Sequence, residues 1–195
     1  MRYETPETKE EAVSLLSMAD GSGRVLAGGT DLLVQLRSGM IDPDVVVDIK
    51  QIAETREIVV ENGAFRVGAA VTGAELDEHD ALKKAWPGVV EAVELIGSTQ
   101  IQGRASMGGN LCNASPAADS VPALIAAGAQ CHIAGFDGER TLPVEQFCTG
   151  PGVTNLKTGS FWFLSRSPPG NQFGRCVSSV YPQNRNGHRC CRSRR

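Results

Sequence analysis

The spacing of apolar residues predicts alternating helices and strands over the first 55 residues. In TPETKEEAVSLLSMAD, apolar residues recur at helical spacing behind a threonine that can cap the helix. The short apolar strand VLA follows at 25–27, then a glycine turn and a short helix that begins near Asp31 and stops at Gly39. The continuous run VVVDI at 45–49 is typical of a buried strand in a parallel sheet.

The pattern changes from residue 56 onward and mixes hairpins with helices. Two apolar stretches, IVV and FRVGA, flank Asn62-Gly63, which is a strong signal for a β-hairpin. Thr72 is placed to cap one long helix through GAELDEHDALKKAW, and Pro87 is placed to open another. VPALIAAGA predicts a further helix, and QCHIAG followed by FDGER predicts a strand and a turn. We therefore expect an α+β protein with one lobe at 1–55 and a second at 56–159.

The stretch GRASMGGNLCNASPAADS at 103–120 has neither the helical nor the strand period. It predicts a long loop in which glycines let the backbone approach a ligand closely. A second glycine segment, AGGTDLL at 27–33, combines a strand, a glycine turn and a helix start, a geometry that presents backbone N–H groups to an anion. Two such segments that converge can hold a diphosphate. The common fingerprints GxGxxG and GxxxxGK[ST] do not occur.

Composition bounds the class of protein. A chain of 195 residues with 41% hydrophobic residues and a net charge of −3 is long enough to bury a core. The apolar runs are too short for a membrane span and the N-terminus is too acidic for a signal peptide, so we expect a cytoplasmic location. The six cysteines show neither CxxC nor zinc spacing, which predicts no disulfide framework and no metal site. His79, His132 and His188 are interpreted as surface or incidental residues.

These motifs resemble a known family. AGGTDLL, then IGSTQIQGRASMGGNLCNASPAADSVPALIAAGA, then TGPG at 149–152 closely resemble the FAD-binding (medium) subunit of molybdenum hydroxylases. That family includes the flavin domain of xanthine dehydrogenase and the medium subunit of carbon monoxide dehydrogenase. The resemblance covers residues 1 to about 159. It implies the two-lobed FAD-binding fold of the PCMH/vanillyl-alcohol-oxidase type, with the C-terminal domain of such subunits missing from this chain.

The resemblance also implies which residues bind FAD. The first segment is expected to wrap the pyrophosphate with backbone amides, and the second is expected to face it from the other lobe. Asp119 matches the acid that contacts the adenosine portion, although a helix N-cap is the alternative role for that residue. Ile96 matches an apolar residue that lines the flavin. The full set is Ala27, Gly28, Gly29, Thr30, Asp31, Ile96, Thr99, Ser106, Met107, Gly108, Gly109, Asn110, Ser115 and Asp119.

The function that the resemblance implies is electron transfer, with no nucleophile or general base on this chain. In the family a molybdopterin subunit oxidises the substrate, a [2Fe-2S] subunit relays electrons, and the flavin passes them to NAD, oxygen or another acceptor. None of the cysteines is expected to be a cluster ligand. Two alternatives stay open: a stand-alone flavin oxidoreductase, with Cys112 as the nearest candidate for a covalent flavin link, and a non-catalytic fragment that no longer holds FAD.

The last segment, 160–195, differs sharply in composition, because it contains seven Arg and no Asp, Glu or Lys. The codons for residues 180–194, read one base later, can spell FIPRTEMDIAVVGAG, which resembles the opening of the family's next domain. Residues 160–168, read one base earlier, can spell the strand-like EFLVSLSFP. We therefore expect a frameshifted or disordered tail that does not pack as the family's strand does. The alternative is a genuine basic tail that binds nucleic acid or an acidic partner.

Overall fold

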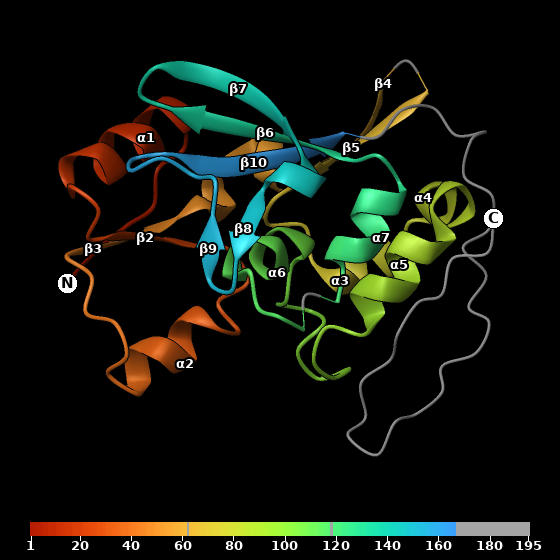
Figure 1. The fold of residues 1–195 in the computed structure, drawn as a ribbon, viewed down its shortest axis with the longest axis horizontal. Helices are drawn as coiled ribbons and strands as arrows, with labels where there is room; N and C mark the ends of the chain where they lie inside the picture. Colours follow the sequence, from red (N-terminus) through yellow and green to blue (C-terminus); the bar gives the residue numbers. More distant parts are fainter. Residues whose placement is uncertain (62, 118, 167–195) are drawn as a thin grey trace.

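A three-stranded parallel sheet forms the first part of the fold (Figure 1). The structure, a computed structural model, describes residues 1–61, 63–117 and 119–166. The strands are β1 (Arg2–Glu4), β2 (Gly23–Leu26) and β3 (Val45–Asp48), in the order β1-β3-β2. All four residues of β3 are buried, so the expected buried parallel strand is confirmed.

Two helices connect these strands on opposite sides of the sheet (Figure 1). The helix α1 (Lys9–Met18) begins at Thr8, whose side chain accepts a hydrogen bond from the Glu11 N–H, as the capping pattern predicts. It packs against β2, β3 and β6. The short helix α2 (Leu32–Arg37) follows the first glycine segment and has no buried residue.

A five-stranded antiparallel sheet forms the second part. Its order is β4 (Ile58–Glu61), β5 (Ala64–Gly68), β10 (Phe161–Arg166), β6 (Gln130–Gly135) and β7 (Gly138–Pro143). The strands β4 and β5 form the hairpin expected from Asn62-Gly63. A small hairpin, β8 (Cys148–Gly150) with β9 (Val153–Thr154), lies beside the sheet.

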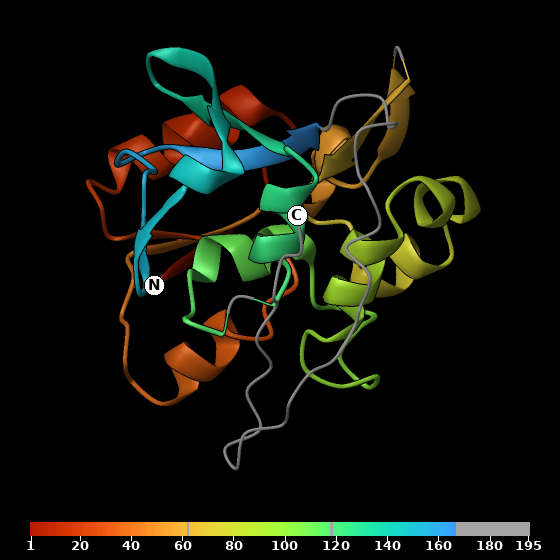
Figure 2. The same ribbon diagram turned by 45° about the vertical axis from the view of Figure 1, so that its right-hand side comes forward.

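Helices cover one face of this second sheet, as Figures 1 and 2 show. They are α3 (Gly73–Asp77), α4 (Asp80–Ala85), α5 (Pro87–Glu94), α6 (Met107–Asn113) and α7 (Val121–Ala126). Elsewhere in the described residues the chain forms the 3₁₀ turns η1 (Ile49–Gln51), η2 (Ala53–Thr55) and η3 (Val144–Gln146). The single long helix expected after Thr72 is instead the pair α3 and α4. His79 explains the break, because its Nδ1 accepts a hydrogen bond from the Leu82 N–H and caps α4. His79 is thus a structural residue and not an incidental one.

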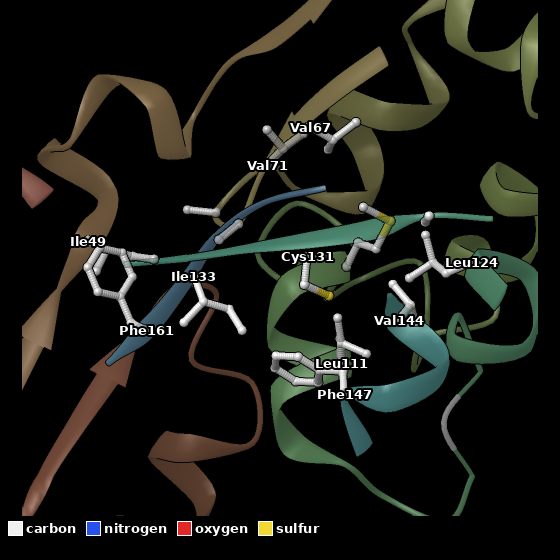
Figure 3. Packing of buried hydrophobic residues seen from close by; sticks show 14 of the residues in the cluster. Ile49, Val67, Val71, Leu111, Leu124, Cys131, Ile133, Val144, Phe147 and Phe161 are labelled. Atoms are coloured by element: carbon white, nitrogen blue, oxygen red, sulfur yellow. The ribbon is translucent and has the colours of Figure 1, made fainter. Parts of the chain in front are cut away.

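One hydrophobic cluster runs through both parts of the fold (Figure 3). Ile49, which follows β3, lies near Phe161 at the start of β10, and Phe147 packs by Leu111 of α6. Each of these side chains is at most 1% exposed. Because the cluster is shared, the two parts fold against each other, and the division at residue 55 stays a prediction.

The strand β10 corrects one expectation about the tail. Phe161–Arg166 was expected not to pack as a family strand, yet it lies in the middle of the five-stranded sheet between β5 and β6. The sequence FWFLSR is rich in aromatic residues, which suits a strand. The rest of the tail, 167–195, lies outside the described residues, so the frameshift and the basic-tail hypotheses stay predictions for that segment.

Candidate functional site

The first glycine segment connects β2 to α2 as the sequence predicts. The strand β2 ends at Leu26, and α2 begins at Leu32. Gly29 has a φ of +82°, in the left-handed region that favours glycine. Its carbonyl accepts a hydrogen bond from the Leu33 N–H at 3.0 Å, which closes the turn onto the helix. The positive φ of Gly29 and this hydrogen bond together join β2 to the start of α2.

Four consecutive N–H groups of this segment have no acceptor among the described residues. Within the described part of the chain, no acceptor is found for the backbone N–H of Gly28, Gly29, Thr30 or Asp31. The side chain of Asp31 does not cap α2 either. Unpaired N–H groups that lead into a helix are suited to an anion such as a phosphate. They can donate hydrogen bonds to it, and the positive end of the helix dipole attracts its negative charge.

The second glycine segment is a helix start and not the long loop that the sequence predicts. Ser106 caps α6: its Oγ accepts a hydrogen bond from the Gly109 N–H at 3.0 Å, and its carbonyl accepts one from the Asn110 N–H at 3.0 Å. Gly108 and Met107 therefore lie in the first turn of a helix, and both are buried. A side-chain cap thus supports a helix that the two glycines alone would disfavour.

The two glycine segments lie in direct contact. A Cβ atom added to Gly28 would fall 2.0 Å from the backbone oxygen of Arg104. Such a contact is possible only because residue 28 has no side chain. Further along, Gln35 Nε2 of α2 donates to Asn113 Oδ1 of α6 at 3.5 Å. The convergence of the two segments, which the sequence could only suggest, is therefore present in the structure.

Hydrogen bonds to α3 hold the second segment in place. Thr72 and Ser106 form an isolated antiparallel bridge. The Gly73 N–H donates to the Ala105 carbonyl at 2.9 Å, and the Ala74 N–H donates to the Gln102 carbonyl at 3.1 Å. Contacts with the start of α3 thus fix the start of α6.

Asn110 has a structural role that the sequence does not predict, and its expected contact with the ligand stays a prediction. Its side-chain oxygen accepts hydrogen bonds from the Ser120 Oγ at 2.6 Å and the Ser120 N–H at 3.3 Å. The oxygen therefore ties α6 to the start of α7. Ser120, and not Asp119, occupies the N-cap position of α7, so the capping alternative for Asp119 is wrong. Asp119 is partly exposed one residue earlier, and its role as an adenosine contact stays a prediction.

The other expected site residues are more dispersed. Ile96 is 8% exposed and belongs to the hydrophobic core, as does Met107, which is 1% exposed. Thr99 is exposed on the turns between α5 and α6. The Ser115 Oγ accepts a hydrogen bond from the Ala117 N–H at 3.3 Å. Among the described residues, no hydrogen bond joins Ile96, Thr99 or Ser115 to the first glycine segment, and their contacts with the cofactor stay predictions.

A buried polar network beside the first segment was missed by sequence reasoning. Asp48, at the end of β3, is 5% exposed. It accepts hydrogen bonds from Tyr3 Oη at 2.5 Å and from Lys50 Nζ at 2.7 Å, and Lys50 Nζ also donates to the Ala27 carbonyl at 3.1 Å. The signal in the sequence was an acid and a lysine directly after an apolar strand, in VVVDIK.

The network shifts the pKa of two of its members. Burial raises the pKa of the Asp48 carboxyl, but the hydrogen bonds from Lys50 and Tyr3 outweigh it and hold that pKa below its ordinary value. The hydrogen bond to Asp48 raises the pKa of the Tyr3 hydroxyl. At neutral pH Asp48 is therefore a carboxylate and Tyr3 a neutral phenol.

Other candidate features lie elsewhere. A hollow of about 550 Å³ lies between α1 and the β6–β7 hairpin, and its lining includes no residue of either glycine segment. None of the expected site residues lines this hollow. Among the described residues no cluster of three His, Cys, Asp or Glu could hold a metal ion. No helix in the described ranges is long and apolar enough to cross a membrane.

Comparison with known proteins agrees with the geometry. Residues 1–162 match the family described as the FAD binding domain in molybdopterin dehydrogenase. The chain is 33% identical to a xanthine dehydrogenase FAD-binding subunit of Escherichia coli O157:H7, over 86% of this chain and 57% of that protein. It is 30% identical to the carbon monoxide dehydrogenase medium chain of Hydrogenophaga pseudoflava, over 85% and 58% of the two chains.

Solved structures show the same fold. Carbon monoxide dehydrogenase from Oligotropha carboxidovorans superposes with a TM-score of 0.84 at 27% identity, covering 88% of this chain and 60% of that one. Quinoline 2-oxidoreductase from Pseudomonas putida 86 superposes with a TM-score of 0.82 at 26% identity, covering 87% and 59% of the two chains. The chain thus spans somewhat more than half the length of the relatives that it matches.

Proposed function

Since the chain belongs to the family of FAD-binding domains of molybdopterin dehydrogenases, we propose that it is the flavin-binding, electron-transferring part of a molybdenum hydroxylase. In this proposal the [2Fe-2S] cluster of a partner subunit delivers electrons that come from a molybdopterin subunit, and NAD or another acceptor removes them. A cytoplasmic location is part of the proposal. The relatives named as FAD-binding subunits and medium chains support an assembly of this kind.

The observation that carries the proposal is the set of N–H groups at Gly28, Gly29, Thr30 and Asp31, which find no acceptor in the described ranges and lie next to the segment that starts α6. These donors fit the diphosphate of FAD, because a diphosphate is an extended anion that accepts several hydrogen bonds at once. Gly28 allows the two segments to approach, and Gly29 allows the turn. Asp119, which directly precedes the Ser120 that donates to Asn110 of α6, is proposed to bind the adenosine portion.

The chain's own residues have a binding and orienting role in this proposal. When bound, the flavin ring supplies the redox chemistry, accepting electrons and passing them on. The two glycine segments would fix the diphosphate and thereby set the position of the ring relative to partner proteins. Ile96, Thr99 and Ser115 remain proposed contacts for the rest of the cofactor. No residue is assigned a nucleophilic or acid–base role.

Titration of the flavin-free protein with FAD tests the proposal. We expect saturable quenching of FAD fluorescence, competition by ADP, which carries the same diphosphate, and weaker binding of riboflavin, which has none. Protein that binds neither FAD nor ADP would favour the alternative of a fragment that has lost its cofactor. Flavin that stays attached after denaturation would favour a covalent link, for which Cys112, exposed on α6, is the candidate.

Co-purification tests the proposed partners. A tagged chain expressed in its native host should bring down a molybdopterin-containing subunit and an iron–sulfur subunit, identified by mass spectrometry and metal analysis. Cell fractionation with the same tag checks the cytoplasmic location. Turnover of a substrate by the isolated chain, without such partners, would instead support the stand-alone oxidoreductase.

A further inference from the structure

The buried network of Tyr3, Asp48 and Lys50 ends on the first glycine segment. Lys50 Nζ donates to the carbonyl of Ala27 at 3.1 Å and to Asp48 Oδ2 at 2.7 Å, while the Lys50 N–H donates to Asp48 Oδ1 at 3.0 Å. The Asp48 carboxylate therefore holds both the backbone N–H and the side-chain Nζ of Lys50. Its ammonium is held in one place against the backbone at residue 27.

This contact fixes the plane of one peptide group. A trans peptide is planar, with its C=O and N–H pointing in opposite directions, and the described residues contain no cis peptide. The Ala27 carbonyl points at Lys50, so the Gly28 N–H points away from it. That N–H is one of the donors for which no acceptor is found within the described residues.

The network reaches the segment from every strand of the parallel sheet. Tyr3 comes from β1, Asp48 from β3, and Ala27 directly follows β2, whose Leu26 is in register with Asp48. On its other side the segment is closed by the Arg104 backbone against Gly28. A free loop would have to be ordered when ligand binds, at a cost in affinity, whereas this peptide is ordered beforehand.

We propose that Lys50, held by Asp48 and Tyr3, is a positioning residue that fixes the Ala27–Gly28 peptide so that the Gly28 N–H is presented to the diphosphate of the cofactor. The inference rests on the proposed function, since it assigns the ligand of that N–H. This positioning role differs from that of a counter-ion, which would attract the diphosphate by its own positive charge. Asp48 neutralises the charge of Lys50 at 2.7 Å, so the pair as a whole adds no net attraction for a diphosphate.

The experiment measures the Kd of ADP and of FAD for the full chain and four variants. Lys50→Met should raise both Kd values about tenfold, the size expected for losing a hydrogen bond made by a charged group. Asp48→Asn should raise them as well, although it leaves the protein more positive. Tyr3→Phe, which changes no charge at neutral pH, should raise them by a smaller factor. Lys157→Met is the matched control, because Lys157 pairs with exposed Asp137 away from the site, and its Kd values should not change.

The outcomes separate the possibilities. Unchanged ADP affinity in both Lys50→Met and Asp48→Asn overturns the inference and leaves the proposed function standing. Tighter ADP binding by Asp48→Asn, with weaker binding by Lys50→Met, shows a counter-ion and also overturns it. A wild-type chain that binds neither ligand overturns the proposed function and the inference with it.

A second measurement separates positioning from general loss of structure. In protein labelled with ¹⁵N-glycine, the Gly28 amide signal should shift on addition of ADP to wild type, and Lys50→Met should alter its position before ADP is added. Circular dichroism checks that each variant is folded. If Lys50→Met does not fold, Asp48→Asn and Tyr3→Phe test the same inference, and a Gly28 signal that is identical in all folded variants contradicts it.

Discussion

The backbone carbonyl of Arg104 lies 2.0 Å from the point where a Cβ atom on Gly28 would stand. This relationship joins two segments that are more than seventy positions apart in the sequence and brings the start of α6 to the turn after β2. It makes Gly28 a packing requirement, in addition to the ligand-binding role proposed for it. The contact is to backbone, which cannot swing aside as a flexible side chain can.

Gly28→Ala should therefore separate the two segments. We expect a loss of about 1–3 kcal/mol in the free energy of unfolding, the usual cost of overpacking, together with loss of FAD retention. Chemical denaturation and a flavin titration measure the two effects. Gly103→Ala is the matched control, since a Cβ atom there meets nothing within 4 Å. Equal stability of the two variants would contradict the packing relationship.

Ser106→Ala should weaken the start of α6. Ser106 is 2% exposed, and its Oγ accepts a hydrogen bond from the Gly109 N–H. Removal of the hydroxyl therefore leaves a helix N–H without its acceptor. The expected cost is about 1 kcal/mol, typical for a lost N-cap. Thermal unfolding measures it, and Ser106→Asp, which retains an acceptor, should recover most of the loss. An alanine variant as stable as wild type would show that the cap contributes little.

The role of Asn110 is tested in a similar way. Its side-chain oxygen accepts two hydrogen bonds from Ser120, so Asn110→Asp, which keeps an acceptor, should preserve the link between α6 and α7 better than Asn110→Leu. The leucine variant should leave the buried Ser120 hydroxyl unpaired, at a cost of about 1–3 kcal/mol. Denaturation midpoints of the two variants provide the comparison. Identical midpoints would mean that Ser120 finds another acceptor.

Features that depend on neighbouring residues are predictable from the sequence, and features that depend on contacts between distant residues are not. Residues 25–39, the strand VVVDI and the Asn62-Gly63 hairpin were predicted because local composition determines them. The helix α6 was missed, because MGGNLCN has poor helical propensity and depends on the Ser106 cap and the bridge to Thr72. The contact of Lys50 with Ala27 was missed for a similar reason, since nothing local to either residue indicates that they meet.

The strand β10 shows the same limit. Its sequence does not by itself distinguish it from the unusual tail that follows. Its pairing with β5 and β6, which are distant in the sequence, makes it a strand. Phe161→Ala tests how much the strand contributes. Phe161 is 1% exposed beside Ile49, so the variant should lose about 3–5 kcal/mol of stability. Urea denaturation measures this, with exposed Phe136→Ala as the control. A loss no larger than that of the control would contradict the packing of β10.

Acid should remove the contribution of Asp48. Its pKa in the folded protein is held below the ordinary value of 3.8, so the folded state favours the carboxylate, and the stabilisation is fully present above that value. As the pH falls below 3.8 and through the folded pKa, the carboxylate takes up a proton and the stabilisation is lost. Wild type should therefore be more stable than Asp48→Asn at pH 6 to 7, by a margin that shrinks progressively below about pH 4. Urea denaturation of both proteins across this range measures the margin. A margin that stays constant down to the lowest pH at which both proteins fold would show that the network does not depend on the charge of Asp48.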